Sequence, residues 1–231
     1  MKTRRFLFGS FLALLSFLCL PTGNAQDNKA FNWGIRAGLN AMTPISSFTA
    51  QMAETELENV QVKNKVGLNA AFFTRINLDQ FFFQPELNWN SNQEELSFSI
   101  PEDSGIGLKA SNIDIDSYSA NVSMLLGYNV VSNGPYLFNV MLGTSYKYNY
   151  MTKFRFDNNV NFSTYEPDYS YQAIAVVSFS IDVFYFDVRY EYNFPNTKIE
   201  FANMEDSPEN IKPLTINKNE NILSFSVGMM F

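Results

Sequence analysis

The sequence contains no histidine and a single cysteine, and these two shortages exclude several classes of function. Without His, the chain has no Ser-His-Asp or Cys-His nucleophile, no H-E-x-x-H zinc motif and no imidazole general base. Cys19 alone forms no intramolecular disulfide and does not supply the ligands of structural zinc or iron–sulfur centres. We therefore expect no catalytic residue, no metal site and no cofactor.

Charge is also sparse, because only 17% of the 231 residues are Asp, Glu, Lys or Arg and the formal net charge is −7. A nucleic-acid partner would require a basic face, so this class of partner is excluded. The length favours one domain after any targeting segment is removed.

The first 25 residues have the pattern of a targeting segment. Lys2, Arg4 and Arg5 precede an apolar stretch from Phe6 to Leu20, and small residues then lead to Ala25. The apolar stretch is too short to cross about 30 Å of hydrocarbon as a helix, which disfavours a membrane anchor. We predict a secretory signal peptide over 1–25, cleaved after Ala25, and a separate domain over 26–231.

Apolar and polar residues alternate after residue 25, although no apolar run there reaches the length of a transmembrane helix. In 31–42, for example, Trp33, Ile35 and Leu39 alternate with Arg36 and Asn40. This period of two predicts β-strands. The alternating segments are 31–42, 66–76, 81–90, 117–128, 136–148, 169–181, 184–193 and 223–231.

The connections between these segments alternate in length. Tight turns are predicted at 77–79, 132–135 and 182–183, whereas long polar loops such as 43–64 and 195–219 join the other pairs. An even number of strands with short turns at one end and long loops at the other is typical of an outer-membrane β-barrel. We predict an all-β fold, a closed antiparallel eight-stranded up-and-down barrel, with both termini periplasmic and the long loops extracellular.

The ionisable residues indicate which face of the strands meets lipid. A soluble lipocalin-like barrel is the alternative, but its narrow interior could not hold the many large apolar side chains of one face. On a lipid-facing wall, each basic residue would cost about 2–4 kcal/mol near the midplane. We therefore expect the charges to form a paired network in the lumen and the barrel to be non-conducting. These seven residues are Arg36, Arg75, Glu86, Lys147, Asp187, Arg189 and Glu191.

Two further features follow from this orientation. Aromatic residues near strand ends are expected to form interfacial girdles. They are Trp33, Trp89, Tyr128, Tyr136, Tyr148, Tyr169 and Tyr192. Pro85 lies on the lipid face of its strand and cannot donate a ladder hydrogen bond, which predicts a bulge or a local break.

Four short motifs stand out along the strands: Trp33-Gly-Ile-Arg-Ala-Gly-Leu-Asn40, Phe83-Gln-Pro-Glu-Leu87, Val188-Arg-Tyr-Glu-Tyr192 and Ser224-Phe-Ser-Val-Gly228. Together they resemble the PorT-like outer-membrane β-barrel family of Bacteroidota-type bacteria. The last strand, with Phe225, Val227, Met229 and the C-terminal Phe231, is similar to the signal that the barrel insertion machinery recognises. The resemblance to the name-giving member implies a part in type IX protein secretion.

The predicted loops contain acidic and aromatic residues whose role the sequence leaves open. The acidic groups lack the spacing of an EF-hand, so we interpret them as solvated loop charge. They are Glu54, Glu56, Glu58, Glu94, Glu95, Glu102, Asp103, Glu205, Asp206 and Glu209, and Asp114 and Asp116 are interpreted as the base of a strand. The loop apolar residues Phe98, Ile100, Phe154, Phe162 and Tyr165 could extend the barrel outward or contact a partner.

These patterns favour a non-enzymatic outer-membrane protein with a structural or interaction role at the cell surface. Its expected partners are outer-membrane lipid and lipopolysaccharide, the barrel insertion machinery and proteins of a secretion or surface complex. An accessory component of a secretion complex is the second hypothesis. A lipid-modifying or proteolytic barrel enzyme, against which the missing His argues, and a small channel are the third and fourth.

Overall fold

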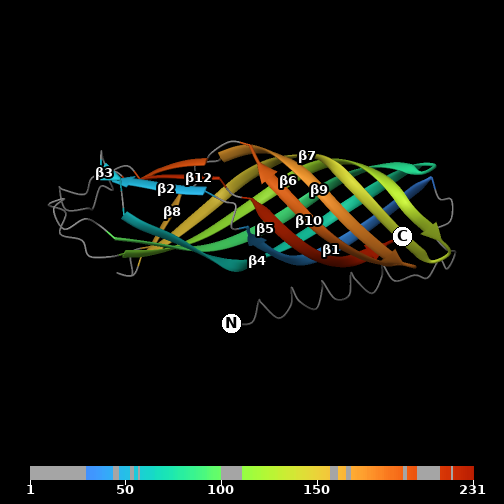
Figure 1. Ribbon diagram of the computed structural model, residues 1–231, viewed down its shortest axis with the longest axis horizontal. Helices are drawn as coiled ribbons and strands as arrows, with labels where there is room; N and C mark the ends of the chain where they lie inside the picture. The colour runs from blue at the N-terminus through green and yellow to red at the C-terminus, as the bar shows by residue number, and fades with distance from the viewer. Residues whose placement is uncertain are drawn as a thin grey trace, which may run out of the picture.

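Eight long antiparallel strands close into a barrel in the computed structural model of this protein (Figure 1). The structure describes residues 30–43, 47–52, 55–56, 58–99, 111–156, 161–164, 168–194, 197–201, 214–219 and 221–231, so the predicted signal peptide lies outside the described residues. The barrel strands are β1 (Phe31–Met42), β4 (Glu58–Leu78), β5 (Phe81–Ser99), β6 (Ser111–Asn133), β7 (Tyr136–Phe156), β9 (Asp168–Ile181), β10 (Phe184–Asn193) and β13 (Ile222–Met230). Within the described residues, no helix is long and apolar enough to span a membrane.

Neighbours in sequence pair with each other around the barrel, and the first strand closes the ring with the last. β1 pairs with β13 from Gly34↔Met230 to Met42↔Ile222 and with β4 on its other edge. The pairing of β6 with β7 completes the circle. The predicted closed up-and-down topology is confirmed, and every barrel strand has a partner on both edges.

Three tight turns lie at one end of the barrel, where Figure 1 also places the C-terminus. Asp79, Gly134 and Asp182 adopt positive φ angles of 60°, 57° and 54°. Glycine tolerates this conformation without strain, and Asp tolerates it better than most residues. The first two turns are shorter than predicted. β4 extends to Leu78 and leaves only Asp79 and Gln80 outside the strands, and β6 extends to Asn133 and leaves only Gly134 and Pro135.

The opposite end carries more β-structure than the sequence predicted. β4, β5, β6 and β7 contain 21, 19, 23 and 21 residues and extend well beyond the alternating segments, and β8 (Asn161–Thr164) pairs with the end of β7. The expected loops 43–64 and 195–219 contain strands, namely β2 (Ser47–Met52), β3 (Thr55–Glu56), β11 (Thr197–Phe201) and β12 (Leu214–Asn219). These four form a second sheet in the order β11-β12-β2-β3, which joins the first long connection to the last. We call the ends of β4 to β7 that lie opposite the short turns their outer ends. The second sheet, β8 and these outer ends together form what we call the extension.

The extension can be tested with an engineered disulfide across β2 and β12. Thr49 faces Asn217 in the antiparallel register, and directly opposed residues have Cα atoms about 4.5–5.5 Å apart, within reach of a disulfide. The variant Thr49→Cys/Asn217→Cys is expected to form an intramolecular disulfide under mild oxidation, seen as a faster band on a denaturing non-reducing gel. Thr49→Cys/Lys198→Cys is the control, because Lys198 pairs with Asn217 on the far edge of β12 and should not cross-link. Equal cross-linking of both pairs would contradict the register.

Side chains alternate between the outer wall and the lumen along each barrel strand. In β10, Phe184, Phe186 and Val188 are exposed on the outer wall, while Asp187 and Arg189 are buried inside. A shift of the strand pairing by one residue would turn every side chain to the opposite face of the barrel. Because the outer face requires apolar residues and the lumen accepts polar ones, the sequence pattern fixes the register.

Pro85 interrupts the sheet without a bulge. The pairing of β4 with β5 stops at Phe73↔Glu86 and resumes at Ile76↔Phe83 in the same register, while the pairing of β5 with β6 continues through Pro85↔Met124. The missing N–H of proline therefore breaks the ladder on one edge only. The register shifts between β4 and β5 lie elsewhere, including one between Lys65 and Leu68.

Candidate functional site

The lumen brings most of the predicted charged residues into one cluster around Glu86. Arg36 of β1 and Arg189 of β10 both contact Oε2 of Glu86 on β5, Arg36 at 3.1 Å. Gln84 donates a hydrogen bond of 2.7 Å from Nε2 to Oε1 of the same carboxylate. Glu86 is 2% exposed, so its charge is compensated by protein groups rather than by bulk water.

The remaining acidic residues of the cluster lie on β10. Arg36 Nε is 3.3 Å from Asp187 Oδ2, and Arg189 Nη1 is 3.8 Å from Glu191 Oε1. Arg36 also donates hydrogen bonds to Asn88 Oδ1 at 2.6 Å and Ser226 Oγ at 3.1 Å. Arg36 therefore links β1, β5, β10 and β13 across the lumen.

The remaining two predicted lumen residues, Arg75 and Lys147, lie next to uncharged side chains. Arg75 Nε donates to Gln84 Oε1 at 2.8 Å, so it reaches Glu86 only through that glutamine. Its guanidinium lies 4.0 Å from the centre of the Phe82 ring and 5.9 Å from that of Tyr185. Lys147 is buried on β7, where its cross-strand neighbours are Asn121 and Ser170.

Glu94 is a lumen residue and not the loop residue that the sequence suggested. β5 continues to Ser99, and Glu94 is 1% exposed on the inner wall. It adds a fourth carboxylate to the three predicted in the lumen. The alternation of Gln84, Glu86, Asn88, Asn90 and Asn92 points inward along β5, and extending it beyond Asn90 would have found Glu94.

Two clusters of buried apolar residues lie in the lumen at the short-turn end, and the sequence analysis missed them. We call them together the plug: Phe82, Leu125, Met141, Ile174 and Val176 in one cluster, and Phe73, Tyr185 and Met230 in the other. A Cβ on Gly127 would lie 2.0 Å from the Phe82 ring, and a Cβ on Gly34 would lie 2.4 Å from the Phe73 ring. Because glycine has no side chain, Gly127 and Gly34 provide the space that the rings of Phe82 and Phe73 occupy. The plug and the ion-pair cluster both lie in the lumen, with the plug nearer to the short turns.

Comparison with known proteins places this architecture in a family. Residues 24–198 match the family model described as outer membrane protein beta-barrel domain. The chain belongs to this family. No curated protein matches the sequence.

One solved outer-membrane protein shares the fold of this outer-membrane β-barrel protein, and two others are similar to it. OprG from Pseudomonas aeruginosa is 12% identical with a TM-score of 0.55, over 90% of this chain and 99% of that one. Ail of Yersinia pestis is 15% identical with a TM-score of 0.43, over 88% of this chain and 100% of that one. Neisserial surface protein A is 14% identical with a TM-score of 0.40, over 88% of this chain and 98% of that one.

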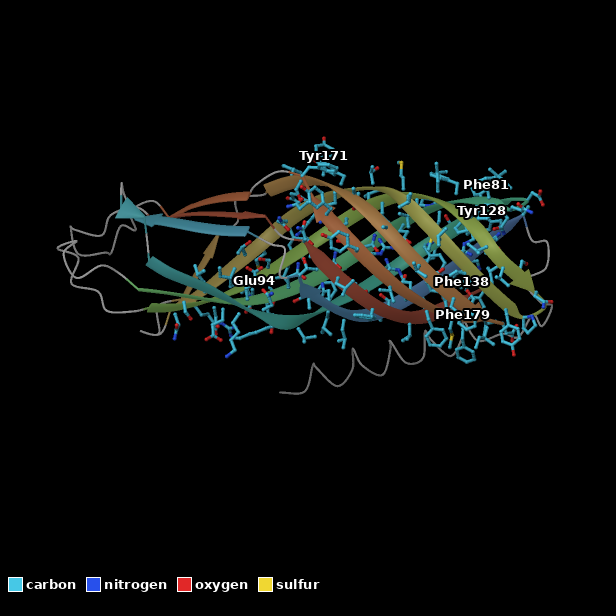
Figure 2. The ribbon with its side chains drawn as sticks, viewed as in Figure 1. Phe81, Glu94, Tyr128, Phe138, Tyr171 and Phe179 are labelled. Carbon is cyan, nitrogen blue, oxygen red and sulfur yellow. The ribbon has the colours of Figure 1, made fainter. Side chains whose placement is uncertain are left out.

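In an outer-membrane β-barrel, the exposed apolar wall is the lipid-facing surface. All the predicted girdle aromatics lie exposed or half-buried on this wall. Figure 2 shows Phe81, Tyr128, Phe138 and Phe179 together at the short-turn end and Tyr171 toward the other end. Phe81 and Trp89 are eight positions apart on β5. For a tilted strand this spacing corresponds to a height of roughly 20 Å along the barrel axis, near the height of the apolar band of such barrels.

The acidic residues at the outer end form ion pairs where the structure describes them. Asp114 contacts Lys65 at 2.7 Å and Asp116 contacts Arg155 at 2.8 Å, and Lys65 is also 3.3 Å from Glu95. No metal-binding group of His, Cys, Asp and Glu occurs among the described residues. The other acidic and apolar residues that the sequence predicted in loops have side chains outside the described residues, although five of them lie in strands: Glu56 in β3, Glu58 in β4, Phe98 in β5, Phe154 in β7 and Phe162 in β8. The full set is Glu54, Glu56, Glu58, Glu102, Asp103, Glu205, Asp206, Glu209, Phe98, Ile100, Phe154, Phe162 and Tyr165.

The last strand completes the lipid-facing wall. Phe225 and Val227 are exposed on it, and Met229 is half-buried. Phe231 exchanges backbone hydrogen bonds of 3.0 and 2.8 Å with Trp33, and the two rings are 4.9 Å apart. The C-terminal residue is thus part of the contact between the first and last strands.

Proposed function

We propose that this protein is a non-enzymatic outer-membrane barrel that anchors the extension at the cell surface, where the extension contacts other molecules. The observation that carries this proposal is the contrast between the two ends. At the short-turn end, the plug lies in the lumen. At the other end, β4 to β7 remain paired beyond the position of Trp89, the last of the described lipid-facing aromatic residues of β5. A lumen filled by ion pairs and rings supports a structural role rather than transport.

The orientation in the membrane belongs to the same proposal. A signal peptide over 1–25 directs export, both termini of the barrel domain face the periplasm, and the extension faces outward. Phe225, Val227, Met229 and Phe231 serve as the signal for the insertion machinery. Short turns on the periplasmic side and longer extracellular segments are the usual arrangement in such barrels.

A part in a type IX-like secretion complex is the second candidate. It is favoured by the four motifs that resemble the PorT-like family, three of which lie on the adjacent strands β1, β13 and β10. Under this hypothesis, a secretion component should be the molecule that contacts the extension.

The test combines conductance with cross-linking in native cells. The purified protein is expected to produce no conductance steps in planar bilayers. A variant in which 47–56 and 197–219 are replaced by short Gly-Ser linkers should remain a heat-modifiable barrel but lose the cross-linked partners of the wild type. Conductance of the wild type would instead support a channel, and cross-links that persist in the shortened barrel would overturn the role of the extension. Identification of the partner decides between a secretion complex and another surface role.

A further inference from the structure

Four tyrosines form a contiguous surface on the lipid-facing wall near its outer end. Tyr146 and Tyr148 of β7 oppose Tyr171 and Tyr169 of β9. The Tyr148 and Tyr169 ring centres are 5.0 Å apart, and Tyr146 lies 5.6 Å from Tyr169 and 5.2 Å from Tyr171. Tyr171 is 65% exposed, and Figure 2 shows it pointing away from the barrel. The cluster therefore presents rings to the surrounding leaflet and not to the lumen.

Two cations follow the tyrosines along the same strand, farther from the short-turn end. Lys153 Nζ lies 5.5 Å from the centre of the Tyr118 ring, which favours a cation at this position. Arg155 donates to Asp116 at 2.8 Å, but its side chain remains 53% exposed. This contact leaves other guanidinium N–H groups available, and guanidinium groups bind phosphate through several such donors.

The order of side chains along β7 defines the chemistry of the surface. Val140 and Leu142 are apolar and exposed, the tyrosines follow, and the two cations come last. From Tyr148 to Lys153 the strand advances roughly 15 Å. A phosphorylated glycolipid places its acyl chains in the bilayer and its phosphate-bearing sugar rings at the surface, so the apolar residues lie at the level of the chains and the tyrosines and cations lie toward the headgroup.

We propose that the outer wall of β7 and β9, with Tyr118 of β6, binds a phosphorylated glycolipid of the outer leaflet. The acyl chains pack on the apolar band, the apolar faces of the sugar rings pack on the tyrosine cluster, and a phosphate meets Lys153 and Arg155. A simple anionic phospholipid offers the tyrosine cluster its headgroup region but no sugar ring to pack on it. The wall of β1 and β13 carries Leu39, Ala41 and Leu223 on its outer half, with no similar aromatic cluster among the described residues.

The test measures lipid binding to the purified full protein in mild detergent by native mass spectrometry. The probes are bisphosphorylated lipid A, dephosphorylated lipid A and phosphatidylglycerol. Wild type is expected to bind bisphosphorylated lipid A at least tenfold more tightly than phosphatidylglycerol. Lys153→Gln/Arg155→Gln should remove the preference for the phosphorylated form, whereas Tyr148→Leu/Tyr169→Leu should weaken binding of both forms of lipid A.

The matched control is Tyr128→Leu/Tyr136→Leu, which changes two aromatics at the short-turn end and should leave lipid A binding unchanged. A heat-modifiable band verifies that each variant folds. Equal affinity of the wild type for lipid A and phosphatidylglycerol would overturn the proposal, as would unchanged binding in both double variants. The partner test replaces only 47–56 and 197–219 and keeps the tyrosine cluster, Lys153 and Arg155, so a failure of lipid A binding would leave the outcome of that test unaffected.

Discussion

Glu86→Gln is expected to lower the free energy of unfolding by about 3–5 kcal/mol, the usual cost of removing one partner from a buried ion pair. Glu86 is the one carboxylate in the described lumen that contacts both Arg36 and Arg189. With a neutral amide in its place, two buried guanidinium groups would share only Asp187 and Glu191, at 3.3 and 3.8 Å. Urea unfolding in lipid vesicles, followed by the fluorescence of Trp33 and Trp89, measures the change.

Two further variants separate this pairing from a general effect of charge. Adding Arg189→Gln to Glu86→Gln should cost less than the sum of the single changes, with a coupling of about 0.5–3 kcal/mol, because both partners are then neutral. Lys65→Gln removes the partly exposed ion pairs of Lys65 with Asp114 and Glu95 and should change stability by no more than about 1 kcal/mol. A loss for Glu86→Gln as small as that for Lys65→Gln would show that the cluster does not stabilise the barrel.

The sequence predicted the membrane-spanning part of the fold well because lipid and lumen impose opposite demands on successive residues. β1 matches its predicted range of 31–42 at both ends. The contrast between the two faces weakens beyond the lipid-facing wall, because polar residues such as Gln93 and Glu95 then occur on the outer face beside the inner Asn92 and Glu94. The sequence pattern therefore marked the outer ends of β4 to β7 only weakly, and the pairing of β2 with β12 joins segments far apart in the chain.

The sequence predicted which face of the strands carries the residues of the candidate site, but it did not predict which of these residues contact one another. Alternation placed Glu86, Arg36 and Arg189 on the inner wall, yet the three residues meet across separations of 50 and 103 positions that only the closed barrel defines. The plug was missed for a different reason. Phe73 and Phe82 follow the outward-facing Phe72 and Phe81, so each pair looks like a continuous apolar run and not an alternation.

Phe82→Ala is expected to lower the free energy of unfolding by about 3–5 kcal/mol, because the fully buried ring would leave a cavity in the plug. The change also removes the ring that lies 4.0 Å from the Arg75 guanidinium. Phe81→Ala is the matched control, since its ring is 62% exposed on the outer wall and leaves no cavity. The same urea titration should give a clearly smaller loss for Phe81→Ala, and equal losses would contradict the position of the plug.

Gly127 provides an independent test of the same contact. Gly127→Ala alone should destabilise the barrel by about 1–3 kcal/mol, because its Cβ would overlap the Phe82 ring at 2.0 Å. In the Phe82→Ala background the ring is absent, so the added methyl group meets no clash. The free energy of unfolding should then fall little further, or part of the lost packing should be recovered. The two substitutions are therefore expected to be non-additive in the stabilising direction. Strict additivity would mean that the ring does not rest on Gly127 and that another residue closes this end of the lumen.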